Sequence, residues 1–146
     1  MQKIVVLYLV FGNENLNEGL DEINKILNRM FDDKEVKYFV IDNSKTIKES
    51  FLTDFYIING DNNYFDFFGW DSGYSFAERN NLLDEDALIL FANDTFFQRS
   101  YSDGEDFLDV FNKDIIKDKD LTNCAIGYID DFPKNVILNE IEYNSW

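Results

Sequence analysis

The chain has 146 residues, the size of one compact domain, and 45% of them are hydrophobic, which is too many for a disordered acidic tail. Its 13 Lys and Arg residues against 29 Asp and Glu residues give a formal net charge of −16, which excludes binding of nucleic acid or anionic membranes through a basic patch. With no His and one Cys, the sequence excludes histidine-based catalysis, an internal disulfide and a zinc site built from Cys and His. The first apolar run is too short for a transmembrane segment and no signal peptide is recognisable, so we expect a cytoplasmic protein.

Periodicity predicts two strands with a helix between them in the first part of the chain. Residues 4–10 form a continuous apolar run of strand length, typical of a strand that is buried on both faces of a parallel sheet. Apolar residues then recur at steps of three or four, which predicts an amphipathic helix carrying Leu16, Leu20, Ile23, Leu27 and Met30. Asn15, followed by Glu18, predicts a capping box at the start of this helix. Residues 36–41 predict the second strand.

The remainder of the chain continues the alternation of strands and helices. Strands are predicted over residues 55–58 and 87–91, with a helix at about residues 72–83 between them. Another capping-box pattern begins at Ser102 and predicts a helix carrying Phe107, Leu108, Phe111, Ile115 and Ile116. Residues 124–129 predict a last strand.

This order of elements is typical of an α/β protein. We expect a single domain over residues 1–146, folded as a Rossmann-like three-layer sandwich with a mainly parallel central sheet. Its first, second and fourth predicted strands should be neighbours.

Small polar residues follow three of the predicted strands. Phe11, Gly12 and Asn13 follow the first strand, Asp42 follows the second and Asp94 follows the fourth. Ligands of open parallel sheets bind beyond the carboxyl ends of the strands, so we expect Asp42 and Asp94 to face one cleft. The same residue types also cap helices and form turns, and this second interpretation stays open.

Residues 59–74 form the most unusual segment, rich in aromatic side chains, amides and glycines. We interpret most of it as a loop that leads from the third strand into a helix, serving as a wall of a ligand site, as a cover of the core, or as both. Trp70 and at least two of Phe65, Phe67 and Phe68 should be mostly buried.

Three segments form an ordered set of motifs that covers about residues 3–95. Residues 40–44 read Val-Ile-Asp-Asn-Ser. Residues 62–64 read Asn-Asn-Tyr and are followed at 69–73 by Gly-Trp-Asp-Ser-Gly. Residues 88–95 read Leu-Ile-Leu-Phe-Ala-Asn-Asp-Thr. In sequence, order and approximate spacing, this set resembles the donor-binding half of GT-A glycosyltransferases, in particular the family 2-like enzymes. The third segment is similar to the variant of the Asp-x-Asp motif that occurs in these enzymes.

The resemblance implies an enzyme that transfers a sugar from a nucleotide-diphosphate sugar to an acceptor, which could be a glycan or a lipid-linked sugar. It places the turn of Phe11, Gly12 and Asn13 against the nucleotide base and implies that Asp42 accepts a hydrogen bond from the base or the ribose. The further residues that it places in the donor site are Asn43, Asp71 and Asn93, with Asn93 near the ribose.

The resemblance also implies a divalent cation, Mn²⁺ or Mg²⁺, bound by Asp94. Such an ion neutralises the diphosphate as the glycosidic bond breaks, and it would reverse the local sign of a chain that repels anions. The segment offers one carboxylate where many relatives have two. The second half of these enzymes supplies the acceptor site and the catalytic base, so catalytic residues stay unassigned and we expect either a short member or an N-terminal part.

A different interpretation is a non-catalytic acidic α/β binding module, an inhibitor or immunity-type partner of a basic protein, which the net charge of −16 favours. Nucleotide binding distinguishes the two interpretations, because only the first requires it. Other doubly wound proteins fit less well: the first strand is followed neither by the acidic pair of a phospho-receiver nor by a flavodoxin-like phosphate loop, and no P-loop or dinucleotide-binding glycine pattern is present.

Overall fold

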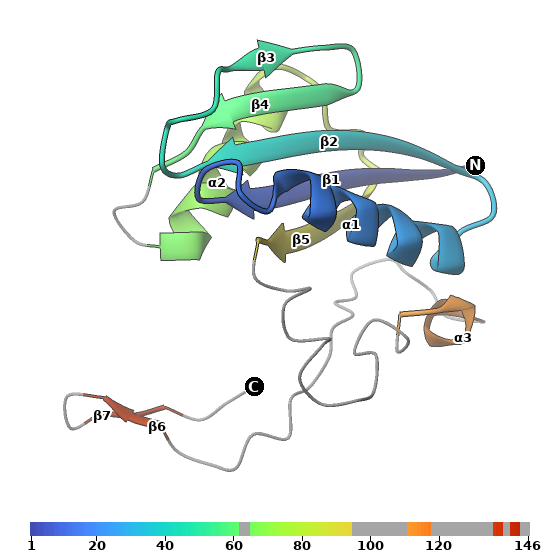
Figure 1. Cartoon of the computed structure of the whole chain (residues 1–146). Coiled ribbons are helices and arrows are strands. Elements are labelled where there is room, and N and C mark those ends of the chain that lie inside the picture. The colour runs from blue at the N-terminus through green and yellow to red at the C-terminus, as the bar shows by residue number, and fades with distance from the viewer. Residues whose placement is uncertain (62–64, 95–110, 118–135, 139–140, 144–146) are drawn as a thin grey trace. The chain divides into compact units, whose positions relative to one another are not determined.

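A computed structural model of the chain describes residues 1–61, 65–94, 111–117, 136–138 and 141–143 (Figure 1). By its internal contacts the chain divides into two units, Met1–Ile115 and Ile116–Trp146. The strand predicted over residues 124–129 lies outside the described residues, as does most of the helix predicted to begin at Ser102.

Five strands form one sheet in the first unit, in the order β3-β4-β2-β1-β5 (Figure 1). They are β1 (Gln2–Val10), β2 (Lys34–Asp42), β3 (Ser50–Phe51), β4 (Phe55–Asn59) and β5 (Leu88–Asn93). β1 is parallel to both β2 and β5, β2 is parallel to β4, and the short β3 is antiparallel to β4. The chain therefore has an α/β fold with a mixed, mostly parallel sheet. The expected neighbourhood of the first, second and fourth predicted strands is confirmed, as β1, β2 and β5.

The core lies on both faces of β1, as its continuous apolar run predicts. No residue of β1 between Ile4 and Val10 is more than 3% exposed. On one face, Val6 and Tyr8 belong to a cluster with buried residues of helix α1 (Leu16–Met30). On the other face, the neighbouring residues of β1 belong to a second cluster with helix α2 (Phe65–Arg79). Figure 1 shows the two helices on opposite faces of the sheet.

α1 lies where periodicity predicts a helix, but the predicted capping box is absent. Asn15 makes no side-chain capping hydrogen bond. Its backbone oxygen instead accepts a hydrogen bond from the buried Tyr8 hydroxyl at 3.1 Å and another from the Gly19 N–H at 3.0 Å. The start of α1 is thus tied to β1 through a main-chain carbonyl, because Tyr8 points from the strand into the helix layer.

α2 begins at Phe65, well before the predicted start at residue 72, and ends at Arg79. The interpretation of this segment as a loop is therefore wrong from Phe65 onward. A Cβ at Gly73 would lie 2.8 Å from the Ile41 side chain, and a Cβ at Gly69 would lie 2.3 Å from Leu9 Cδ1. These glycines form the helix face that touches the sheet, and the close packing that they permit outweighs their low helix propensity.

The helical conformation also changes the position of the aromatic residues. Phe67 is 81% exposed and Phe68 is 38% exposed, so the prediction that at least two of the three phenylalanines are buried is wrong. The glycine face of α2 meets the sheet, and residues on the other side of the helix therefore face outward. Trp70 is mostly buried, as expected: its Nε1 donates to the Ala92 carbonyl at 3.0 Å, and its ring meets the Phe91 ring edge to face with the centroids 5.7 Å apart.

Ion pairs join the amino ends of the central strands to the segment that precedes β5. Asp84 accepts hydrogen bonds from Lys37 Nζ of β2 at 3.0 Å and from Lys3 Nζ of β1 at 3.3 Å. The Lys3 ammonium also reaches Asp86 at 3.3 Å. These contacts fix the entry of β5 at the end of the sheet opposite to its carboxyl ends.

Three short elements follow β5 among the described residues. α3 (Lys113–Ile116) is a single turn, and Lys113 forms an ion pair with Asp32. β6 (Val136–Leu138) and β7 (Ile141–Tyr143) form an antiparallel hairpin of their own. None of the described helices is long and apolar enough to cross a membrane.

Candidate functional site

The carboxyl ends of β1, β2 and β5 meet at one end of the sheet, where the chain connections reverse. α1 connects β1 to β2 across one face, whereas α2 connects β4 to β5 across the other face. In open parallel sheets, ligands bind at the point where connections diverge in this way, here between β1 and β5. The register places Val10 beside Asp42 and Leu9 beside Asn93, so the polar residues after these strands begin at the same level.

Asp42 ends β2 and is completely buried, at 0% exposed. Its Oδ1 accepts hydrogen bonds from the N–H groups of Gly12 (3.0 Å) and Ser44 (2.9 Å) and from the Ser44 hydroxyl (2.7 Å). Its Oδ2 accepts from the N–H groups of Thr46 and Ile47, both at 2.7 Å. Burial by itself raises the pKa of a carboxyl group, but these bonds, first among them that from Ile47, outweigh burial and hold the pKa of Asp42 below its ordinary value. Asp42 is thus a charged anchor for the loop that follows β2.

The turn after β1 is held by two carboxylates from the strands on either side. The Phe11 N–H donates to Asp94 Oδ2 at 2.9 Å, and the next N–H, that of Gly12, donates to Asp42 Oδ1 at 3.0 Å. Gly12 has φ +86°, a conformation that favours glycine. The prediction that Asp42 and Asp94 lie at the same edge of the sheet is confirmed. Between them, Phe11 presents a side chain that is 63% exposed.

Of the remaining residues predicted for the site, two lie near the turn after β1 and two lie on the α2 side of the sheet. Asn13 is exposed in the same turn, where its carbonyl accepts the Leu16 N–H, and Asn93 ends β5 beside β1. Asn43 is 7% exposed, and its amide lies on the α2 side of the sheet, next to Gly60 and Gly69. Asp71 is exposed on α2 and lines a separate surface hollow.

The two carboxylates differ in what they can bind. Every hydrogen bond described above for Asp42 comes from the chain itself, which is the turn-forming role that the sequence left open. Asp94 is only partly buried, and of its two oxygens Oδ2 holds the Phe11 N–H. Within the described ranges, no group of three or more carboxylate or Cys side chains is placed to hold a metal ion. A divalent cation at Asp94 would therefore take most of its roughly six oxygen ligands from a bound diphosphate and from water.

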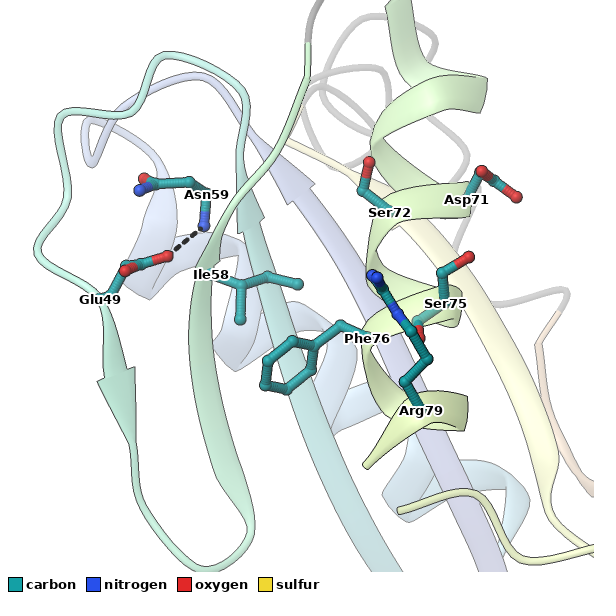
Figure 2. A pocket seen from close by; sticks show the side chains of 8 residues that line it. All are labelled: Glu49, Ile58, Asn59, Asp71, Ser72, Ser75, Phe76 and Arg79. Atoms are coloured by element: carbon teal, nitrogen blue, oxygen red, sulfur yellow. Dashed lines mark hydrogen bonds between the residues drawn. The ribbon is translucent and has the colours of Figure 1, made fainter. Parts of the chain in front are cut away.

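Sequence reasoning missed the hollow that Asp71 lines. It has a volume of about 340 Å³ and lies between α2 and the carboxyl end of β4 (Figure 2). Ser72, Ser75 and Arg79 recur at helical spacing, which is a weak signal for a shared face of α2. The strand wall, which includes Asn59, becomes part of the hollow only through the packing of α2 on the sheet.

Comparison of the chain with protein-family models, with curated proteins and with solved structures finds no match. The function is therefore inferred from the residues and from the geometry of the strand ends.

Proposed function

We propose that this chain is the donor-binding part of a glycosyltransferase with a GT-A-like, Rossmann-like three-layer arrangement, and that it holds a nucleotide-diphosphate sugar beyond the carboxyl ends of β1 and β5. The turn after β1 carries the proposal. Two carboxylates from the neighbouring strands fix consecutive N–H groups of this turn at the point where the sheet connections diverge. The motifs that resemble the donor site of these enzymes supply both carboxylates.

The base-binding end is proposed to be the turn of Phe11, Gly12 and Asn13. The exposed Phe11 ring offers a flat apolar surface on which a nucleotide base can lie, and aromatic stacking of this kind accepts any base. Asn93, at the end of β5, is proposed to lie on the ribose side. Asp42 supports this end by fixing the Gly12 N–H, and a hydrogen bond from the base or the ribose would have to share an oxygen with that network. The sequence also assigned Asn43 and Asp71 to the donor site, but Asn43 lies on the α2 side of the sheet and Asp71 lines the separate hollow, so this proposal uses neither residue.

The diphosphate end is proposed to be Asp94 together with Mn²⁺ or Mg²⁺. A chain with a net charge of −16 repels a diphosphate, and none of the residues assigned here to the base-binding and diphosphate ends is a Lys or an Arg. A divalent cation between Asp94 and the phosphates would convert this repulsion into attraction. Metal and nucleotide should therefore bind cooperatively, each weakly without the other. The acceptor, a glycan or a lipid-linked sugar, belongs to the same proposal.

Calorimetry with the diphosphates of uridine, guanosine, cytidine and thymidine, and with their sugars, tests this function with and without Mn²⁺. At least one diphosphate should bind, and Mn²⁺ should strengthen its binding. Asp94→Asn should remove the gain from Mn²⁺. Asp54→Asn changes an exposed carboxylate at the opposite end of the sheet and should preserve that gain.

The proposal fails if no diphosphate binds in saturating Mn²⁺, or if the two variants behave alike. If the chain binds no diphosphate, the second function is favoured, which is an acidic module that binds a basic protein. The net charge of −16 supports that alternative, and its complex should weaken steeply as salt is added.

A further inference from the structure

The hollow between α2 and β4 has an apolar floor and two polar walls. Ile58 of β4, which is 4% exposed, and Phe76 of α2 form the floor. Asn59 and Glu49 form the strand wall, where Glu49 Oε1 accepts the Asn59 N–H at 3.2 Å, the bond drawn in Figure 2. Arg79 and Ser75 belong to the helix wall.

The charges on the two walls are opposite but do not meet. The Arg79 Nε donates to the Ser75 carbonyl at 3.0 Å, which holds the guanidinium along α2. Among the described residues, Arg79 forms no ion pair, although the chain carries 29 acidic residues. Within the part of the chain that the structure describes, no hydrogen bond engages the other N–H groups of Arg79 or the second oxygen of Glu49. Figure 2 shows Glu49 on the strand side and Arg79 on the helix side, while the Asp71 carboxylate points away from the strand.

We propose that this hollow binds a small zwitterion, an α-amino acid with an apolar side chain, as a site separate from the nucleotide site. The ammonium group contacts Glu49, the carboxylate contacts Arg79, and the side chain lies on Ile58 and Phe76. A guanidinium binds a carboxylate through two parallel hydrogen bonds, which gives this end of the ligand its orientation. A volume of about 340 Å³ accommodates such a molecule with room for water.

The charges of the lining argue against two other classes of ligand. Glu49, Asp71 and Arg79 together carry a net charge of 1 − 2 = −1, so a doubly charged anion such as phosphate meets net repulsion. An uncharged sugar would leave both charged groups without a partner of opposite sign. A zwitterion offers each wall its complement and adds no net charge.

Titrations with L-leucine and L-phenylalanine, followed by the amide chemical shifts of the whole chain, test the proposal. The amides of Asn59 and Ser75 should shift during the titration. The N-acetylated and the carboxyamidated forms each lack one charge and should bind about tenfold more weakly, as expected when a hydrogen bond to a charged group is lost. Glu49→Gln and Arg79→Gln should each cause a similar loss. Glu78→Gln on α2 and Arg29→Gln on α1, which lie outside the hollow, should bind as the wild type does.

Three outcomes overturn the proposal. In the first, neither amino acid shifts these amides at millimolar concentration. In the second, the blocked forms bind as tightly as the free amino acids. In the third, inorganic phosphate or glucose binds in the hollow more tightly than they do. None of these outcomes bears on the nucleotide site, because its titrations use other ligands and other variants.

Discussion

Asp42 and Asp94 bind consecutive N–H groups of one turn: Asp94 accepts from Phe11 at 2.9 Å and Asp42 from Gly12 at 3.0 Å. The two carboxylates lie at the ends of β2 and β5, which flank β1 on opposite sides. The ends of three strands are therefore joined through a single turn, although the two carboxylates are far apart in sequence. Each makes charge-assisted hydrogen bonds, which are stronger than bonds between neutral groups.

Replacing Asp42 should destabilise the fold before it affects any ligand. In Asp42→Asn, the side chain loses its charge and turns an NH₂ group toward N–H donors that it cannot accept from. We expect the free energy of unfolding to fall by about 2–4 kcal/mol, from weakened bonds and buried donors left unpaired. Urea titration measures the change. Asp54→Asn is the matched control and should cost less than about 0.5 kcal/mol. Equal midpoints for the two variants would contradict the anchoring role of Asp42.

The contribution of Asp42 should disappear in acid. Its pKa in the folded chain lies below the value near 3.8 expected for the unfolded chain. The stability that it contributes is therefore complete above pH 3.8 and is lost as the pH falls toward the lower, folded-state value. The difference in unfolding free energy between wild type and Asp42→Asn should stay constant well above pH 3.8 and shrink as the pH falls through and below that value, as denaturant titrations at each pH would measure. A difference that stays constant, or grows, would be incompatible with a depressed pKa.

Gly73→Ala should destabilise the protein although alanine favours helices. The new methyl group would lie 2.8 Å from Ile41, a fully buried side chain, so α2 or the strand has to move. Overpacking of this kind costs about 1–3 kcal/mol. At the upper end of that range, the cost exceeds the gain of about 1 kcal/mol that alanine brings in helix propensity. Ser72→Ala, one residue away on α2, is the control and should change the unfolding free energy little. Increased stability of Gly73→Ala would show that α2 does not pack this closely on β2.

Trp70 and Phe67 should differ strongly when each is truncated. Trp70→Ala removes the bond to the Ala92 carbonyl and the contact with Phe91, at a cost of about 3 kcal/mol. Phe67→Ala removes a ring that is 81% exposed and should cost less than about 0.5 kcal/mol. Chemical unfolding of both variants measures the contrast. Similar losses would mean that Phe67 is covered in the folded protein.

The pattern of apolar residues predicted those strands and helices whose apolar side chains form the core on the two faces of the sheet. β1 is an apolar run because both of its faces are covered, and α1 shows clear periodicity because one side of it faces water. β3 could not be predicted, because two residues carry no periodicity and their pairing depends on β4. The start of α2 could not be predicted for a related reason. Glycine is typical of turns, and Gly69 and Gly73 can be recognised as helix residues only from their close packing on the sheet.

The candidate site was predictable in its position and not in its bonding. Asp42 and Asp94 could be placed at one edge because the carboxyl ends of parallel strands meet there. The hydrogen bonds of Asp42 could not be predicted, because they depend on how the loop after β2 folds back. In that fold, the N–H groups of Thr46 and Ile47 both donate to Asp42 Oδ2. The hollow at Arg79 requires β4 and α2 to pack together, and no local pattern contains that information.

The position of β1 between β2 and β5 also bears on how the chain is made. Ile4 pairs with Val36 on one side and with Leu88 on the other. A ribosome releases β1, α1 and β2 well before β5, so this unit can form while the other edge of β1 is still without its strand. An apolar, unpaired edge is a site of wrong pairing between nascent chains. Slow synthesis between β2 and β5 would lengthen that exposure, and the yield of folded protein should depend on how quickly this stretch is translated.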